Sequence, residues 1–86
     1  MGQVRTNYYL RMRAADRPKV LATVAAIFGD HDVSIESVVQ KRGSGDEAEI
    51  AWVTHQTREG SVREALAEIG RSPNVLEISS CIRVEE

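Results

Sequence analysis

One short stretch decides how this chain folds: Ala15-Asp16-Arg17-Pro18-Lys19-Val20-Leu21. We expect it to end a strand, to turn at Pro18 and to open an amphipathic helix, because proline fits the first helical turn, where its missing N–H does no harm. The start of a helix offers unpaired backbone N–H groups and the positive end of a dipole, which favour an anion such as a carboxylate. Asp16 beside them is placed to hold an ammonium group. This one turn could therefore bind both the carboxylate and the ammonium group of a free amino acid.

Hydrophobic periodicity on either side of this turn predicts the remaining elements. Alternation with period two indicates strands, stripes with helical spacing indicate helices, and Gly43-Ser44-Gly45-Asp46 predicts the turn of a hairpin. The predicted elements, in chain order, are a strand over 6–15, a helix that runs to about His31, strands over 33–42 and 47–55, a helix that starts between Thr57 and Ser61 and ends at Ile69, and a strand from Val75 to Val84.

Several local features refine these elements. Asp32 is expected at the turn that ends the first helix, where glycine would be most comfortable. The adjacent Val38 and Val39 break strict alternation, which indicates either a bulge or two covered faces. The second helix has two candidate caps, Ser61 in a capping-box pattern and Thr57 one turn earlier. One face of the last strand is predicted to carry Leu76, Ile78, Ile82 and Val84.

The order strand, helix, strand, strand, helix, strand predicts an α+β fold of the ferredoxin-like βαββαβ type. Two right-handed strand–helix–strand crossovers give a four-stranded antiparallel sheet with both helices on one face. The strand over 47–55 has apolar residues on both faces, Ile50 and Trp52 on one and Ala51 and Val53 on the other. This pattern favours a partner on the face away from the helices, and we expect a homodimer.

Composition limits the classes of function. Eighty-six residues make one domain, and a net charge of −2 with 28% charged residues of both signs argues against binding of nucleic acid. No apolar run is long enough to span a membrane, and the single cysteine, Cys81, rules out an internal disulfide, so we expect a cytoplasmic protein. Cys81 is expected to be a packed thiol. His31 and His55 have no third ligand at metal-binding spacing, so no metal site is expected.

The opening stretch and several others resemble a known family. Residues 16–21, followed by Ile27-Phe28-Gly29-Asp30-His31-Asp32-Val33-Ser34-Ile35, resemble the start of an ACT domain, a small amino-acid-sensing module of metabolic enzymes. More narrowly, the chain from about Arg5 to its end resembles the C-terminal ACT domain of bacterial homoserine dehydrogenase. The stretches that carry this narrower resemblance are Asn7-Tyr8-Tyr9-Leu10-Arg11, Ser34-Ile35-Glu36-Ser37-Val38-Val39-Gln40-Lys41, Glu49-Ile50-Ala51-Trp52-Val53-Thr54-His55 and Ile82-Arg83-Val84-Glu85-Glu86.

The resemblance implies a regulatory domain over 5–86, with residues 1–4 as a linker or cloning remnant. The parent enzyme would interconvert homoserine and aspartate semialdehyde with NAD(P), using catalytic and dinucleotide domains upstream. The chain has no glycine-rich dinucleotide turn, so no cofactor and no catalytic residue are expected in it. The implied ligand is threonine, as a feedback signal in threonine biosynthesis. The implied partners are a second copy of the chain and the catalytic domain of the parent enzyme.

In ligand-binding ACT domains the amino acid commonly sits at a dimer interface, between the first loop with its helix start and the beginning of the second strand. The resemblance therefore implies ligand-binding roles for backbone N–H groups from Lys19 to Leu21 on the carboxylate and for Asp16 on the ammonium. Ser34 would contribute its hydroxyl to a side chain or a water. The implied ligand-binding residues are Asp16, Lys19, Val20 and Leu21, with Ser34 and Ile35 facing them.

Lys19 departs from the family pattern, which usually has glycine at this position. Glycine permits unusual backbone angles and a close approach of the ligand to the main chain. The lysine side chain could crowd the site, pair with the ligand carboxylate, or pair with Asp16 and close the site. Two functions follow as alternatives: a domain that binds an amino acid, or an ACT-like module used only for oligomerisation. Pairing of chains side by side and pairing face to face are both compatible with the sequence.

Overall fold

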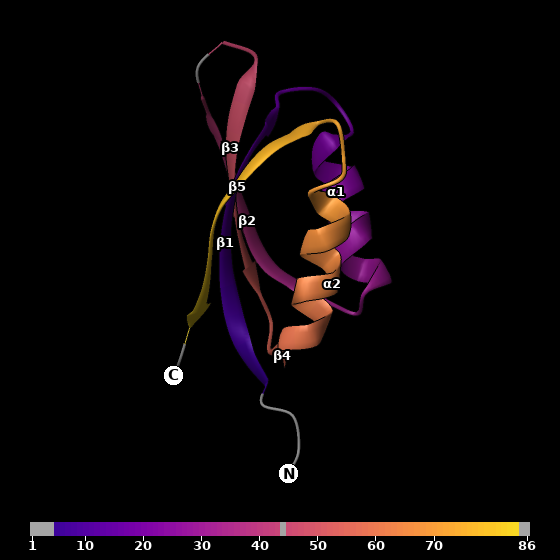
Figure 1. The fold of residues 1–86 in the computed structure, drawn as a ribbon. Helices are drawn as coiled ribbons and strands as arrows, with labels where there is room; N and C mark the ends of the chain where they lie inside the picture. Colours follow the sequence, from indigo (N-terminus) through magenta and orange to yellow (C-terminus); the bar gives the residue numbers. More distant parts are fainter. Residues whose placement is uncertain (1–4, 44, 85–86) are drawn as a thin grey trace.

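The computed structural model describes residues 5–43 and 45–84, so the predicted linker over 1–4 lies outside the described residues. The predicted order of elements is confirmed, with one short strand in addition (Figure 1). The elements are β1 (Arg5–Ala15), α1 (Val20–Asp30), β2 (Ile35–Arg42), β3 (Glu47–Thr54), β4 (Thr57–Arg58), α2 (Glu59–Ile69) and β5 (Val75–Val84).

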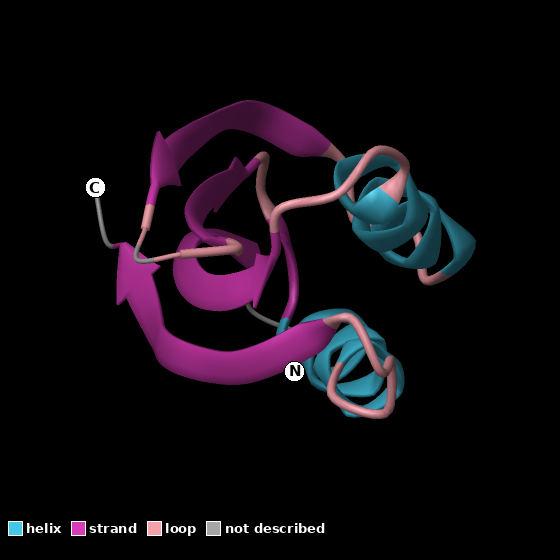
Figure 2. Cartoon of the chain, turned by 90° about the horizontal axis from the view of Figure 1, so that it is seen from above, coloured by secondary structure: helices cyan, strands magenta, loops and turns pink. Residues whose placement is uncertain are grey.

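The sheet is antiparallel and is built around β1. Its order is β2-β3-β1-β5, and the two-residue strand β4 pairs with the first residues of β1, directly after the end of β3 in the chain. Both helices cover one face of the curved sheet, and the described residues leave the opposite face bare (Figure 2). The ferredoxin-like fold is therefore confirmed. The sequence did not predict β4, because a strand of two residues is too short to show a period.

The core lies between the helices and the sheet. Alternate residues of β3 are buried from Ala48 to Thr54, which is the face that the period-two pattern predicts. Phe28 of α1 and Trp52 of β3 are almost fully buried, with ring centroids 5.2 Å apart and ring planes tilted by 58°. Such tilted pairs are a favourable arrangement of aromatic rings. This pair joins the first helix to the middle of the sheet.

Asp32 ends α1 in the predicted way. Its φ of 62° is left-handed, the conformation that glycine adopts most readily. The N–H of Asp32 donates to the carbonyl of Gly29 at 3.1 Å, and the N–H of Val33 donates to that of Phe28 at 2.9 Å. These two bonds form a Schellman motif, and buried Val33 and Phe28 supply its hydrophobic contact.

Replacing Asp32 with glycine is expected to raise the free energy of unfolding by about 0.5 kcal/mol, because glycine takes the left-handed conformation without strain. Asp30→Gly is the matched control, since Asp30 is the last residue of the helix, where replacing aspartate by glycine is expected to cost roughly 0.3 kcal/mol, the difference between their helix propensities. Urea denaturation of the two variants measures both effects. Equal losses of stability would contradict the role assigned to the left-handed position.

The first turns of the helices differ from the prediction in detail, although α2 begins within the predicted range from Thr57 to Ser61. α1 begins at Val20, so Pro18 belongs to the preceding turn and not to the first helical turn. α2 begins at Glu59 after Arg58, which has an extended backbone and no side-chain capping bond. The predicted cap at Ser61 is wrong, because Ser61 already lies inside the helix. Glu59 instead complements the positive helix end and pairs with Arg63 at 2.9 Å.

The prediction for β5 is wrong in one respect that alters a surface. Two irregularities in its pairing with β1 leave Leu76 and Ser79 without a direct partner. Each extra residue shifts the alternation, so Ile78 lies on the helix side while Ile82 lies opposite Tyr9 on the bare face. In β2 the irregularity falls between Ile35 and Ser37 and not at the predicted valine pair.

Candidate functional site

The turn between β1 and α1 is held in a special backbone conformation. Lys19 has φ 77° and ψ −13°, and the N–H of Val20 donates to the carbonyl of Arg17 across a long 3.4 Å bond. Proline followed by a residue with positive φ is the pattern of a type II turn. This geometry explains why glycine would suit position 19, since a side chain there strains the left-handed conformation by about 1 kcal/mol.

The start of α1 is open to an anion. It has no side-chain capping bond and no acidic residue in its first turn. Within 5–43 and 45–84, no backbone acceptor takes the N–H of Leu21 or Ala22. The helix dipole places partial positive charge at the same point. Val20 is buried and Leu21 is half-buried, so these residues anchor the turn in the core while their N–H groups lie at the helix start.

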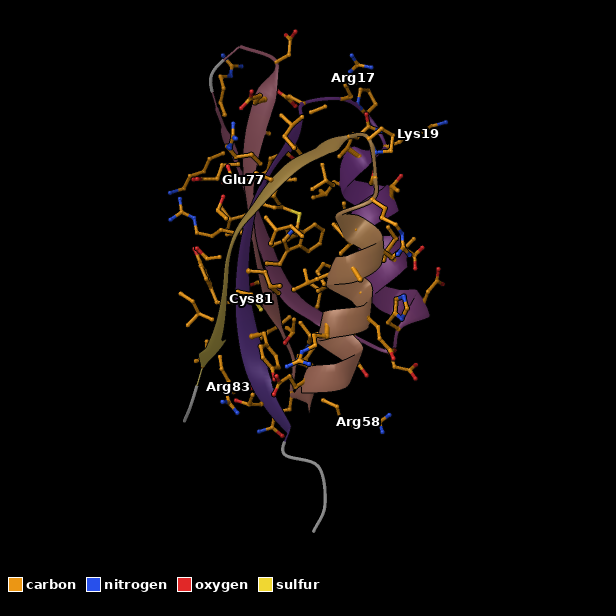
Figure 3. All side chains as sticks on the ribbon, viewed as in Figure 1. Arg17, Lys19, Arg58, Glu77, Cys81 and Arg83 are labelled. Carbon is orange, nitrogen blue, oxygen red and sulfur yellow. The ribbon has the colours of Figure 1, made fainter. Side chains whose placement is uncertain are left out.

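Asp16 lies beside this helix start and is bonded to the β2–β3 hairpin. Its backbone N–H donates to the carbonyl of Asp46 at 2.6 Å, and its carboxylate accepts a bond from Gln40 Nε2 of β2 at 3.3 Å. Within the described part of the chain it forms no ion pair with Lys19, and the side chains of Lys19 and Arg17 extend away from the fold (Figure 3). The exposed carboxylate is thus positioned near an open helix start.

The structure separates the predicted site residues into two groups. Asp16 is bonded to Asp46, next to the first residue of β3, whereas the carbonyl of Ser34 accepts the N–H of His55, just beyond the last residue of β3. Ile35 pairs with Thr54 at that same end. At about 3.3 Å per residue the two ends of β3 are roughly 25 Å apart. The β1–α1 and α1–β2 connections lie at opposite ends of the molecule (Figure 1). A single chain therefore does not bring Ser34 and Ile35 to Asp16.

Gln40 is a site residue that the sequence analysis missed. It pairs with Ile50 of β3 and so lies on the helix side of the sheet. Most residues of the other strands on that side are apolar and buried. A polar residue at a strand position that faces the helices is a feature of the sequence that could have indicated a role in the site. Its amide fixes the Asp16 carboxylate to the edge strand, which ties the turn to β2.

A polar hollow lies at the opposite end of the molecule, near the start of α2. It has a volume of about 200 Å³. Asp32, two residues before Ser34, forms part of its wall. The residues that line it are Asp32, Gln56, Thr57, Arg58 and Ser61.

Two other side chains with reactive groups, His31 and Cys81, lie outside this turn. His31 Nε2 lies 2.9 Å from Glu68 Oε1, a bond that joins the end of α1 to α2. Among the described residues no group of three metal-ligating side chains occurs. Cys81 is exposed, so the prediction of a packed thiol is wrong. Partial burial of its sulfur and nearby Glu59 raise the pKa of the thiol, so it stays protonated near neutral pH and is a poor nucleophile.

The described helices include none with the length and apolar character that a membrane crossing requires. Residues 8–73 match the model of the ACT domain family. The chain belongs to this family of regulatory domains.

Similar proteins indicate the kind of enzyme in which this ACT domain occurs. The chain is 39% identical over its whole length to a homoserine dehydrogenase of Methylobacillus glycogenes, of which it covers 21%. It is 47% identical over 92% of its length to one of Synechocystis sp., of which it covers 18%. The crystal structure of a homoserine dehydrogenase from Thiobacillus denitrificans superposes with a TM-score of 0.86 at 40% identity, over 98% of this chain and 18% of that one. The chain thus spans about a fifth of the length of the relatives it matches.

Proposed function

We propose that this chain is the regulatory domain of a homoserine dehydrogenase and that it binds threonine at the start of α1. The observation that carries the proposal is the open helix start beside the Asp16 carboxylate. The N–H groups of Leu21 and Ala22, which have no backbone acceptor among the described residues, suit a carboxylate, and Asp16 suits an ammonium group at the same place. The parent enzyme would then reduce aspartate semialdehyde with NAD(P)H in the cytoplasm, under feedback control by a product of its pathway.

The ligand site needs a second chain, because Ser34 and Ile35 lie far from Asp16 in one chain. β2 is an edge strand, and every one of its residues except Ile35 is exposed. Antiparallel pairing of two β2 strands about a two-fold axis would place the Ile35 end of one beside the Arg42 end of the other. Gln40 near that end already holds Asp16. Side-by-side pairing therefore supplies the hydroxyl of Ser34 to the amino acid that the other chain holds.

Calorimetric titration of the chain with threonine tests the proposal. Valine is the matched ligand control, because it has nearly the same shape and lacks the hydroxyl. We expect threonine to give a heat signal and to raise the thermal midpoint. We expect the affinity for valine to be about tenfold lower, because the missing hydroxyl removes one hydrogen bond of about 1.4 kcal/mol. The absence of both signals with every amino acid at millimolar concentration would contradict ligand binding.

Lys19 favours the second candidate, a module that only pairs subunits, because it stands where a ligand would approach the main chain. Replacing Lys19 with glycine separates the two functions. Without ligand we expect the thermal midpoint to rise, because glycine relieves about 1 kcal/mol of left-handed strain. We expect the affinity of this variant for threonine to fall about fivefold, since it lacks the lysine ammonium that would pair with the ligand carboxylate. Threonine binding that occurs only in the glycine variant would instead show that the natural chain serves assembly alone.

A further inference from the structure

A row of alternating charge crosses the bare face of the sheet. The strand registers pair Lys41 with Glu49, Glu49 with Arg13, and Arg13 with Glu77, so the four side chains lie in one line across β2, β3, β1 and β5. Arg13 Nε donates to Glu77 at 2.9 Å. The signs along this row are positive, negative, positive and negative. We call these four residues the charged row.

Apolar side chains occupy the same face beside the charged row. Val53, Tyr9 and Ile82 are neighbours across β3, β1 and β5. Ile82 is 54% exposed and Val39 of β2 is 51% exposed, so both edge strands present an aliphatic side chain on this face. A shallow hollow of about 120 Å³ joins the two zones; it is lined by Tyr9, Arg11, Val39, Lys41, Glu49 and Ala51. The face therefore combines an apolar zone with an ordered set of charges.

We propose that this face binds the same face of a second copy about a two-fold axis nearly parallel to the strands. Such an axis places β2 opposite β5 of the second copy and β3 opposite its β1. The charged row is then opposed by its own reversal, so Lys41 meets Glu77 and Glu49 meets Arg13. In the apolar zone Tyr9 meets Val53 of the second copy. Every charge of the row faces the opposite sign, which makes the charged row complementary to itself.

Sheet geometry permits these contacts. Aligned sheets pack about 10 Å apart, a gap that lysine, arginine and glutamate side chains can bridge from both sides. A two-fold axis across the strands would instead place Lys41 opposite Lys41 and Glu77 opposite Glu77. A partner with charge of a single sign would be repelled by half of the row. The row therefore favours a second copy. This surface is separate from the α1 start, and it shares only β2, through Val39 and Lys41, with the β2 edge.

A double-mutant cycle on Lys41 and Glu77 tests the pairing. Two strands separate these residues within one chain, a distance of roughly 14 Å, so their side chains do not meet in the single chain. We expect Lys41→Glu and Glu77→Lys each to weaken self-association about tenfold in sedimentation equilibrium, because each opposes like charges. The double variant is expected to return to within about threefold of the natural chain. Arg71→Glu, an exposed reversal after α2, is the control and is expected to change nothing.

The outcomes separate this proposal from ligand binding. Losses that simply add in the double variant, or association that none of the variants changes, would overturn the face-to-face contact. An association that weakens as salt rises would support it, since exposed charges are screened. Glu77→Lys is expected to bind threonine as the natural chain does, because Glu77 lies on β5, away from the β2 edge. Loss of threonine binding alone would therefore leave the face-to-face contact standing.

Discussion

Affinity for threonine is expected to fall about a hundredfold when Asp16 is replaced by asparagine. The ammonium of the ligand would lose a charge-assisted bond, and hydrogen bonds to charged groups contribute about 1.5–3 kcal/mol. Asparagine has the same shape, and its amide oxygen can still accept the bond from Gln40 Nε2. The turn should therefore keep its place, and isothermal calorimetry measures the loss of affinity.

The control for this change is Asp46→Asn. Asp46 lies next to Asp16, since its carbonyl accepts the Asp16 N–H, and the substitution removes the same charge from the same region. We expect threonine to bind this variant within about twofold of the natural affinity, because exposed charges act weakly over longer distances. An equal loss of threonine affinity in both variants would mean that the summed negative charge of this region attracts the ligand, and not a direct contact with Asp16.

The free energy of unfolding is expected to fall by about 3–5 kcal/mol when Phe28 is replaced by alanine. The side chain is fully buried and packs against Trp52 at 5.2 Å between ring centroids, so its removal leaves a cavity between α1 and the sheet. A small domain has a total stability of only about 5–15 kcal/mol, so this loss is a large share of it. Urea denaturation followed by tryptophan fluorescence measures the effect, because Trp52 lies beside the change.

Two further variants complete this experiment. Phe28→Leu keeps most of the volume and is expected to lose less than about 1.5 kcal/mol, which gives a measurable value even if the alanine variant does not fold. Thr23→Ala on the exposed side of α1 is expected to stay within about 0.5 kcal/mol of the natural chain. A loss below 1 kcal/mol for the alanine variant would contradict the central role of the Phe28–Trp52 pair.

Much of the fold could be predicted because the relevant signals are local. The alternation in β1 and β3 predicted their buried faces, and the helical stripes predicted α1 and α2. Asp32 was predicted at a left-handed position, since the end of a helix has its own chemistry. The start of α2 was less predictable. Thr57 and Ser61 are both plausible caps, and pairing of Thr57 with Thr6 of β1, 51 positions earlier, places it in β4.

The candidate site was predictable in its chemistry and less so in its arrangement. Asp16 and the helix start are neighbours in the chain, so their proximity follows from the turn. Gln40 reaches Asp16 only because β2 and β1 flank β3 in the sheet, which no local pattern reveals. The separation of Ser34 from Asp16 likewise depends on the lengths of α1 and β3.

The sequence by itself determined the order of the elements, the composition of the core and the presence of Lys19 where the family usually has glycine. These properties arise from the period of side chains and from the chemistry of single turns, which act over a few residues. Only the tertiary structure decided that Ile82 lies on the bare face and that four charges align across four strands. The register between distant strands is chosen by packing of the whole core, and one extra residue in β5 reverses which face every later side chain occupies.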